Sequence, residues 1–247
     1  AHYDDGQFDT DREELLGAME AGGVGTIVDA GSTLESWDKI LELTERYPFI
    51  YGAIGIHPDE AGTLDEAGME RMAKLLDGEK IVAAGEIGLD YYWDKENHDI
   101  QKHWFIRQLE LAREKQMPVI IHSREAAADT MDIMKRHAAS MKAVIHCYSY
   151  SAEMAKEYVK MGYYIGVGGV VTFKNAKKLK QVVEEIPLER ILLETDCPYL
   201  APVPFRGKRN SSLNLPYVAE AIAELKGTTP EAVIQQTEKN ARELYGL

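Results

Sequence analysis

The chain has 247 residues, of which 45% are hydrophobic and 28% charged, proportions that are ordinary for a soluble globular domain. Its formal net charge of −13 excludes broad, charge-driven binding to duplex nucleic acid, which usually requires a basic face. A nucleic acid bound at one local site stays compatible with this charge, because metal ions can supply positive charge there. No apolar run is long enough to cross a bilayer, and the N-terminus lacks a signal-peptide pattern. The two cysteines, Cys147 and Cys197, lie far apart in the sequence and do not resemble a disulfide framework. We therefore expect a protein of the reducing cytoplasm.

Short apolar runs alternate with amphipathic helical patterns along the whole chain, without a linker, an internal repeat or a low-complexity segment. In chain order we expect strands at residues 26–31, 50–57, 81–88, 118–122, 143–146, 163–173 and 191–196. One helix is expected to begin at about residue 33, and the others are expected at residues 64–76, 97–115, 126–137, 152–161, 176–185, 213–226 and 230–245. This alternation predicts an α/β fold.

Strands separated by helices of this length need crossover connections, which predicts a parallel sheet. A TIM (β/α)8 barrel and a doubly wound open sheet both satisfy this requirement. We favour a single barrel domain over residues 1–247, because such barrels run to about 250 residues and because polar candidate residues follow many different strands. The expected strands number one fewer than a full barrel needs. We therefore expect that Ala1 is not the natural start and that the first strand is largely absent from the chain as given.

Side chains with metal-binding chemistry stand at the ends of the expected strands. Glu86, His122, His146 and Asp196 each follow a separate apolar run, and so does His57. In a parallel barrel, the carboxyl ends of all strands meet at one mouth, where the active site lies. Imidazole nitrogens and carboxylate oxygens suit Zn²⁺, Mn²⁺ or a related divalent ion. Two such ions about 4 Å apart can activate a water molecule and stabilise both the attacking and the leaving oxygen.

Each of these residues also has a purely structural explanation. A single histidine after a strand is often a hydrogen-bonded structural residue, and a lone carboxylate can cap the following helix. The coincidence of histidines and carboxylates after separate buried strands favours a metal site, because unpaired ionisable groups there would be costly. Cys147 and Cys197 adjoin candidate ligands, and we expect them to fill small buried positions rather than to bind a metal.

Five blocks of sequence, read together, resemble the TatD family of metal-dependent deoxyribonucleases within the amidohydrolase superfamily. The resemblance extends over essentially the whole chain, with the blocks in the family's order. The blocks are residues 55–58 (GIHP), 85–91 (GEIGLDY), 121–124 (IHSR), 194–202 (ETDCPYLAP) and 206–210 (RGKRN).

The resemblance implies a TIM barrel with a binuclear site for divalent metal ions. Carried over to this chain, the implied ligands are His2, Glu86, His122, His146 and Asp196. The family has a His-x-His pair on its first strand, and the partner of His2 would lie two positions earlier, where this chain has no residue. Glu86, which bridges the two ions, and Asp196, which takes the proton from the attacking water, are the expected catalytic residues.

Three further residues are expected to contact the substrate. His57 follows its strand at the same mouth and contacts a phosphate, orients the scissile group or has a structural role. Arg124 and Arg206 are expected to clamp a phosphate through the forked guanidinium group, with a surface position as the alternative for Arg124. The aromatic run at residues 91–93 either stacks on an unpaired base or packs against neighbouring loops.

The function implied is a deoxyribonuclease that cleaves phosphodiester bonds by a metal-activated water, with single-stranded DNA as the expected substrate. The alternative is another amidohydrolase acting on an amide, a lactone or a small phosphoester, because metal ligands specify the activation of water more than the leaving group. A non-catalytic binding barrel is a third interpretation, against which Glu86 and Asp196 argue. The sequence indicates neither a membrane nor a protein partner.

Overall fold

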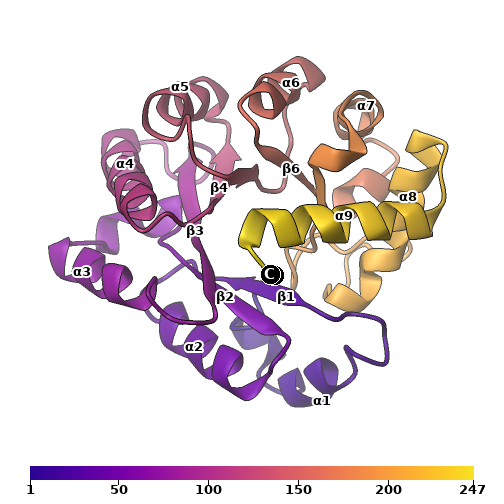
Figure 1. The fold of residues 1–247 in the computed structure, drawn as a ribbon, viewed down its shortest axis with the longest axis horizontal. Helices are drawn as coiled ribbons and strands as arrows, with labels where there is room; N and C mark the ends of the chain where they lie inside the picture. Colours follow the sequence, from indigo (N-terminus) through magenta and orange to yellow (C-terminus); the bar gives the residue numbers. More distant parts are fainter. The chain divides into compact units, whose positions relative to one another are not determined.

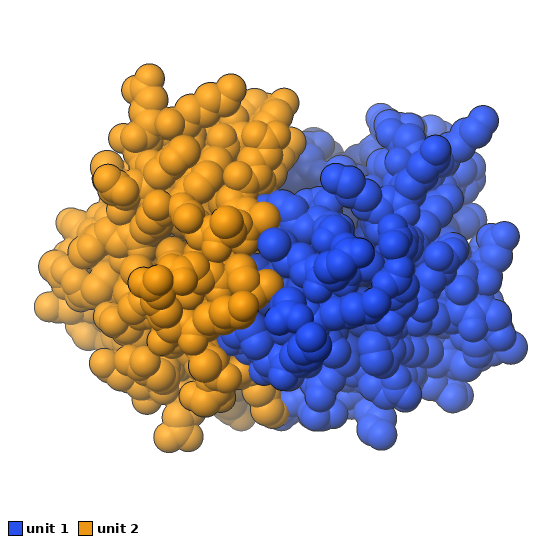
Figure 2. All heavy atoms as spheres, turned by 90° about the horizontal axis from the view of Figure 1, so that it is seen from above, with its two compact units in different colours: residues 1–27, 146–247 blue, residues 28–145 orange.

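The computed structural model describes residues 1–247, which form two compact units. One unit comprises residues 28–145, and the other comprises residues 1–27 together with residues 146–247 (Figure 2). No helix in either unit combines the length and the apolar character that a membrane span requires. The prediction of a single domain stays a prediction, and the two units are described in turn.

The unit of residues 28–145 contains five strands in the order β1-β2-β3-β4-β5 and four α-helices (Figure 1). The pairs β2–β3, β3–β4 and β4–β5 are parallel, as the crossover argument predicts. Helices α2, α4 and α5 pack against β2, β3 and β4 respectively. The strands are β1 (Ile27–Ala30), β2 (Ile50–Ile54), β3 (Ile81–Asp90), β4 (Val119–Arg124) and β5 (Ala143–Ile145), and the helices are α2 (Ser36–Arg46), α3 (Glu66–Leu75), α4 (His98–Glu114) and α5 (Ala127–His137).

Strand β3 is longer than the apolar run predicts and is buried along its whole length. Its register with β4 shifts between Ala84 and Ile87, so Glu86 lies at an irregularity inside the strand rather than at its end. Gly88, two residues further on, has φ of 152° and sits against the backbone of β4. A Cβ atom there would lie 1.9 Å from the carbonyl oxygen of His122, so only glycine permits this close approach.

The second unit contains the parallel pair β6–β7 and most of the C-terminal helices. Helix α9 is tied to β7 by a buried side chain, because Asn240 Nδ2 donates to the carbonyl oxygens of Leu188 and Ile191 at 2.8 Å each. The elements are α1 (Arg12–Gly17), α6 (Ala152–Lys160), β6 (Tyr164–Val167), α7 (Lys177–Glu185), β7 (Ile191–Leu193), α8 (Leu215–Lys226) and α9 (Pro230–Tyr245).

The expected strand at residues 163–173 is wrong in its second half. The strand β6 ends at Val167, and a 3-10 helix follows at Gly169–Thr172. The chain turns there because Gly169 comes so close to the backbone of Leu200 that a Cβ atom would lie 2.1 Å from the Leu200 carbonyl oxygen. The apolar character of the run reflects burial in both halves, which pattern alone cannot separate into strand and helix.

Candidate metal-binding clusters

The first cluster lies in the unit of residues 28–145 and consists of His57, Glu86, Asp90 and His122. We call these four residues the Glu86 cluster. Its central contact joins His122 Nδ1 to Glu86 Oε1 at 2.7 Å, and His122 Nε2 lies 3.0 Å from Asp90 Oδ2. The carboxylates of Glu86 and Asp90 are both buried and therefore largely withdrawn from water. The structure therefore brings the predicted ligands Glu86 and His122 into direct contact.

Asp90, at the end of β3, fixes the orientation of the His122 ring. Its Oδ2 meets His122, while its Oδ1 accepts hydrogen bonds from the backbone amides of Tyr92 and Trp93 at 2.9 and 3.0 Å. Burial raises the pKa of this carboxyl, but the hydrogen bonds from His122 and the two amides outweigh it, so the pKa lies below its ordinary value. If Nε2 donates to a charged Asp90, Nδ1, which lies 2.7 Å from Glu86 Oε1, is the nitrogen that His122 would offer to a metal.

His57 completes the Glu86 cluster at the start of a 3-10 helix (Pro58–Thr63). Its Nδ1 accepts a hydrogen bond from the Asp59 amide at 3.2 Å, and its Nε2 lies 4.0 Å from Glu86 Oε1. Its ring meets the His122 ring edge-on, with centroids 4.3 Å apart. Ligand atoms of His57, Asp90 and His122 all lie within 4.8 Å of one another. His57 thus belongs to the cluster, and its place among the substrate contacts stays a prediction.

The second cluster lies in the unit of residues 1–27 and 146–247 and consists of His2, His146, Cys147, Glu194 and Asp196. We call these five residues the Asp196 cluster. Asp196 Oδ1 lies 3.3 Å from His2 Nε2 and 3.8 Å from His146 Nε2. The backbone amide of His2 also donates to the Cys197 carbonyl oxygen at 2.9 Å, which anchors this end of the chain. The two predicted histidine ligands of this unit therefore converge on one oxygen of the third predicted ligand, Asp196.

Glu194 plays the part in this cluster that Asp90 plays in the other. Its Oε2 lies 3.2 Å from His146 Nδ1, and its Oε1 accepts from the Cys147 backbone amide at 2.7 Å. Gly166 leaves the room for this carboxylate, because a Cβ atom there would lie 2.2 Å from Glu194 Oε2. With its Nδ1 held by Glu194, His146 presents Nε2 toward Asp196.

Two residues of the Asp196 cluster adopt backbone conformations that are rare outside glycine. Asp196 has φ of 54° and Cys147 has φ of 45°. Such left-handed conformations cost free energy in non-glycine residues and concentrate at functional sites. Cys147 is half-buried, and its sulfur lies within 4.8 Å of the ligand atoms of His146 and Asp196. The expectation of small, buried positions is therefore correct for Cys197 and wrong for Cys147.

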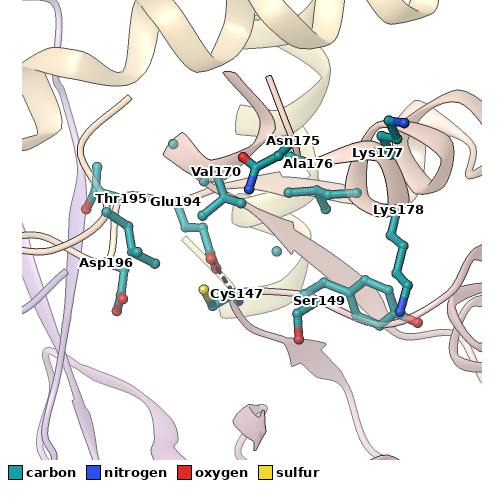
Figure 3. A pocket seen from close by; sticks show the side chains of 16 residues that line it. Cys147, Ser149, Val170, Asn175, Ala176, Lys177, Lys178, Glu194, Thr195 and Asp196 are labelled. Carbon is teal, nitrogen blue, oxygen red and sulfur yellow. Dashed lines mark hydrogen bonds between the residues drawn. The ribbon is translucent and has the colours of Figure 1, made fainter. Parts of the chain in front are cut away.

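A pocket of about 500 Å³ opens beside the Asp196 cluster within the same unit (Figure 3). Figure 3 shows Glu194 and Cys147 side by side, joined by the hydrogen bond just described, with the lysines that begin α7 across the pocket from Asp196 in this view. The lining also includes the glycines at positions 166, 168 and 169, which have no side chain that could fill the pocket. Asp196 is therefore accessible to a molecule that enters this pocket.

The donor atoms of both clusters suit a divalent transition metal. Each cluster offers imidazole nitrogens and carboxylate oxygens, the ligands that Zn²⁺ and Mn²⁺ accept. Each also contains a carboxylate that orients a ligating histidine, Asp90 in one and Glu194 in the other. In chemistry and in convergence, the residues fit the metal-binding role predicted for them.

The arginines predicted to clamp a phosphate have partners of their own. The Arg124 guanidinium carbon lies 4.0 Å from the centroid of the Tyr92 ring, and that of Arg206 lies 4.4 Å from the centroid of Phe173. Arg209, in the same basic block as Arg206, forms a fork-like pair with Asp11 and donates to the Gln7 carbonyl oxygen at 2.6 Å. Part of this block therefore holds the N-terminal segment, and Arg206 is not among the residues that line the pocket of Figure 3.

Sequence reasoning overlooked the two carboxylates that orient histidines. Asp90 and Glu194 both stand inside blocks that were singled out, four residues after Glu86 and two residues before Asp196. The signal available was an acidic residue at the end of each buried strand. Nothing in the pattern says which carboxylate binds a metal and which binds a histidine.

Comparisons with known proteins agree with the geometry. The family profile described as "TatD related DNase" matches residues 1–246. The chain is 47% identical to the metal-dependent hydrolase YabD of Bacillus subtilis over 100% of this chain and 97% of that protein. It is 32% identical to the 3'-5' ssDNA/RNA exonuclease TatD of Cronobacter sakazakii over 97% of this chain and 93% of that protein. The crystal structure of the TatD homologue YjjV of Escherichia coli K12 superposes with a TM-score of 0.94 at 32% identity, covering 100% of this chain and 96% of that one. This match confirms the predicted α/β fold of the TIM-barrel type.

Proposed function

Because the chain belongs to the TatD family of metal-dependent hydrolases, we propose that it is a deoxyribonuclease that hydrolyses phosphodiester bonds in single-stranded DNA. The observation that carries this proposal is the convergence of the five predicted ligands into two clusters. Glu86 contacts His122 at 2.7 Å, and His2 and His146 both lie within 3.8 Å of Asp196. The relative named as an exonuclease on single-stranded DNA and RNA supports the choice of substrate.

The proposed cofactor is a pair of divalent ions. Glu86 and His122 would be ligands from one unit, and His2, His146 and Asp196 from the other. Divalent ions in such sites polarise phosphoryl oxygens and lower the pKa of water, which supplies the nucleophile at neutral pH. Asp90 and Glu194 each contact one ring nitrogen of His122 and His146, and the other nitrogen of each ring would be the one offered to the ion.

The chain's own residues would do the remaining work. Asp196 is the proposed general base, because it is a carboxylate that borders an open pocket and can pass a proton to solvent. Glu86 is buried and lies against His122, which suits a metal ligand better than a proton carrier. His57 and Arg124 are the proposed phosphate contacts, and Arg206 is a third at the loop after β7.

We place the protein in the cytoplasm as part of this proposal. Neither Cys147 nor Cys197 forms a disulfide bond. Free cysteines persist in a reducing compartment, whereas an oxidising one favours their pairing or modification. Fractionation of the native host, with detection of the protein in each fraction, tests this placement.

The test is hydrolysis by metal-reconstituted protein. Equal amounts would be incubated with single-stranded DNA, duplex DNA, RNA and a panel of small amides and lactones, in the presence of Mn²⁺, Zn²⁺ or Mg²⁺ and with a chelator as control. We expect release of nucleotides from single-stranded DNA that depends on the metal. Cleavage confined to the amides or lactones would overturn the nuclease proposal, and no turnover by protein with bound metal would favour a binding role.

A further inference from the structure

Two large aromatic side chains beside the Glu86 cluster are exposed to solvent. Tyr92 is 41% exposed and Trp93 is 65% exposed, whereas Trp37, in the same unit, is fully buried. The centroids of the two rings lie 4.8 Å apart, so they form one apolar patch, and contiguous exposed patches often mark a place of contact. Together with Arg124 we call these residues the aromatic ledge.

The position of the aromatic ledge is set by a residue of the Glu86 cluster. Asp90 Oδ1 accepts hydrogen bonds from the backbone amides of both Tyr92 and Trp93, while Asp90 Oδ2 holds His122. One buried carboxylate thus orients a predicted metal ligand and the turn that carries the two rings. A molecule held on the aromatic ledge is therefore kept at a fixed place relative to His122.

Arg124 adds a cation to this surface. It pairs with Asp90 in the register of β3 and β4, and its carbonyl oxygen accepts from the Tyr91 amide at 2.9 Å. Its guanidinium carbon lies 4.0 Å from the Tyr92 ring centroid and 5.4 Å from that of Trp93. The Tyr92 ring therefore positions the Arg124 side chain. The guanidinium N–H groups of Arg124 lie near Trp93, and no carboxylate forms an ion pair with them.

Tyr91, the third aromatic residue of the run, has a different role. Its hydroxyl donates to Asp129 Oδ2 at 2.7 Å, and its ring stacks on His98 with centroids 3.6 Å apart. Both contacts lie within the protein and tie the turn to α4 and α5. The packing alternative considered for residues 91–93 thus holds for Tyr91, and the two residues after it are left exposed.

We propose that the aromatic ledge binds one unpaired base of a single-stranded nucleic acid, stacked on Trp93, with Arg124 donating to a neighbouring phosphate. The inference rests on the proposed function and names the feature that selects an unpaired strand. Every base has a flat π-face that stacks on an aromatic ring, but in a duplex that face is covered by the next base pair. A guanidinium group matches the geometry of a phosphate. A small amide or lactone has neither a base that could stack on Trp93 nor a phosphate that could accept from Arg124.

The experiment measures binding separately from cleavage. Metal-loaded protein is titrated into a fluorescein-labelled, phosphorothioate-linked single strand that resists hydrolysis, and anisotropy gives the dissociation constant. Trp93→Leu keeps an apolar side chain but removes the ring, and we expect it to weaken binding about tenfold, within the range for loss of one stacked base. Trp93→Phe keeps a stacking face and should stay within about threefold of the unaltered protein. Binding of a phosphorothioate duplex should be weak and equal in all three proteins.

The matched control is a second aromatic–arginine pair on α4. Arg107 lies over the Trp104 ring at 5.9 Å, but its guanidinium is bound to Glu66 at 2.8 and 3.0 Å and is not free for a phosphate. Trp104→Leu should therefore leave binding of the single strand unchanged. Trp37 is buried, so a bound strand should not quench its fluorescence. Quenching of tryptophan fluorescence by the strand should therefore be largely lost in Trp93→Leu and kept in Trp104→Leu.

The outcomes separate this inference from the proposed function. Equal affinity of Trp93→Leu and the unaltered protein for the single strand would overturn the aromatic ledge, even if the protein cleaves DNA. Absence of any binding would overturn it as well. A loss of self-association in Trp93→Leu, seen by analytical ultracentrifugation with DNA binding unchanged, would assign the rings to a protein contact instead. Binding that depends on Trp93 without hydrolysis of an unmodified strand would support the aromatic ledge and overturn the nuclease.

Discussion

The Glu86 cluster and the Asp196 cluster both combine imidazole nitrogens with carboxylate oxygens, but their carboxylates differ in exposure. In the first, the side chains of Glu86 and Asp90 are 5% and 1% exposed. In the second, those of Glu194 and Asp196 are 15% and 19% exposed, and both line an open pocket. Each cluster nevertheless repeats one device, a carboxylate that holds one nitrogen of a histidine and turns the other toward the predicted metal ligands.

The difference in exposure assigns different tasks to the two clusters. A carboxylate buried against histidine keeps its charge and geometry without water, which suits a permanent metal ligand. A carboxylate that borders a pocket can exchange protons with solvent and substrate, which suits a general base. The predictions below start from the largest expected effect, and each either sharpens this contrast or breaks it.

Asp196→Asn should reduce the rate of DNA hydrolysis about a thousandfold, because positioned proton transfer contributes on the order of 10²- to 10⁴-fold. The change is nearly isosteric and lies at a partly exposed side chain, so the melting temperature should stay the same. Single-turnover kinetics at saturating metal measures the rate, with Asp38→Asn, an exposed residue paired with Arg71, as control. Near-normal turnover in Asp196→Asn would show that Asp196 is not the general base.

Gly88→Ala should lower the free energy of unfolding by about 3 kcal/mol, through a strained backbone and overpacking. The added Cβ would meet the His122 backbone at 1.9 Å, and backbone cannot move aside. Gly166→Ala is the matched change in the other unit, where the Cβ would lie 2.2 Å from the end of the Glu194 side chain and no nearer than 3.1 Å to backbone, at His146 Cα. Urea denaturation should show a large loss of stability for the first variant and a small one for the second. Equal losses of unfolding free energy would contradict the view that the surroundings of the Glu86 cluster are less able to move than those of the Asp196 cluster.

Asp90→Asn should weaken metal binding about 10- to 100-fold, as loss of a carboxylate behind a ligating histidine does in other sites. The amide oxygen must stay on the Tyr92 and Trp93 amides, which turns the NH₂ group toward His122 Nε2. Nε2 then becomes an acceptor, the proton moves to Nδ1, and Nδ1 can no longer bind an ion. Isothermal titration with Mn²⁺ measures the affinity, and an unchanged dissociation constant would show that Asp90 does not set the tautomer.

Glu194→Gln should have the same kind of effect on His146 but a smaller one, about tenfold or less. Its contact with His146 is longer, at 3.2 Å, and its side chain is more exposed, so water can partly replace it. The same titration applies, and the ratio of the two losses is the informative quantity. A larger loss in Glu194→Gln than in Asp90→Asn would reverse the assignment of tasks.

The fold and the residues that gather in the two clusters could be predicted because both depend on local pattern. Alternating apolar runs and helices require parallel strands, and Glu86, His122, His146 and Asp196 stand out because charged residues rarely follow buried runs without a partner. Details that depend on tertiary contacts could not be predicted in the same way. The strand expected at residues 163–173 ends at Val167, because Gly169 must pass close to Leu200, a residue distant in sequence.

The roles of individual carboxylates also depend on contacts that a pattern does not contain. Asp90 was read only as part of a block, yet it binds His122 and two backbone amides. Arg209 stands in the same basic block as the predicted phosphate contact Arg206, yet it pairs with Asp11. In each case the partner lies far along the chain or follows from backbone geometry, so residue type and spacing alone leave several roles open.

The most direct test of the metal-dependent account is anomalous diffraction from crystals soaked in Mn²⁺, because manganese positions are read from the data without assumed ligands. We predict one anomalous peak within coordination distance of Glu86 and His122 and another within coordination distance of His2 and Asp196. Occupancy of the first peak should fall in Asp90→Asn. Protein that hydrolyses DNA in Mn²⁺ while its crystals show no peak at either cluster would contradict the account.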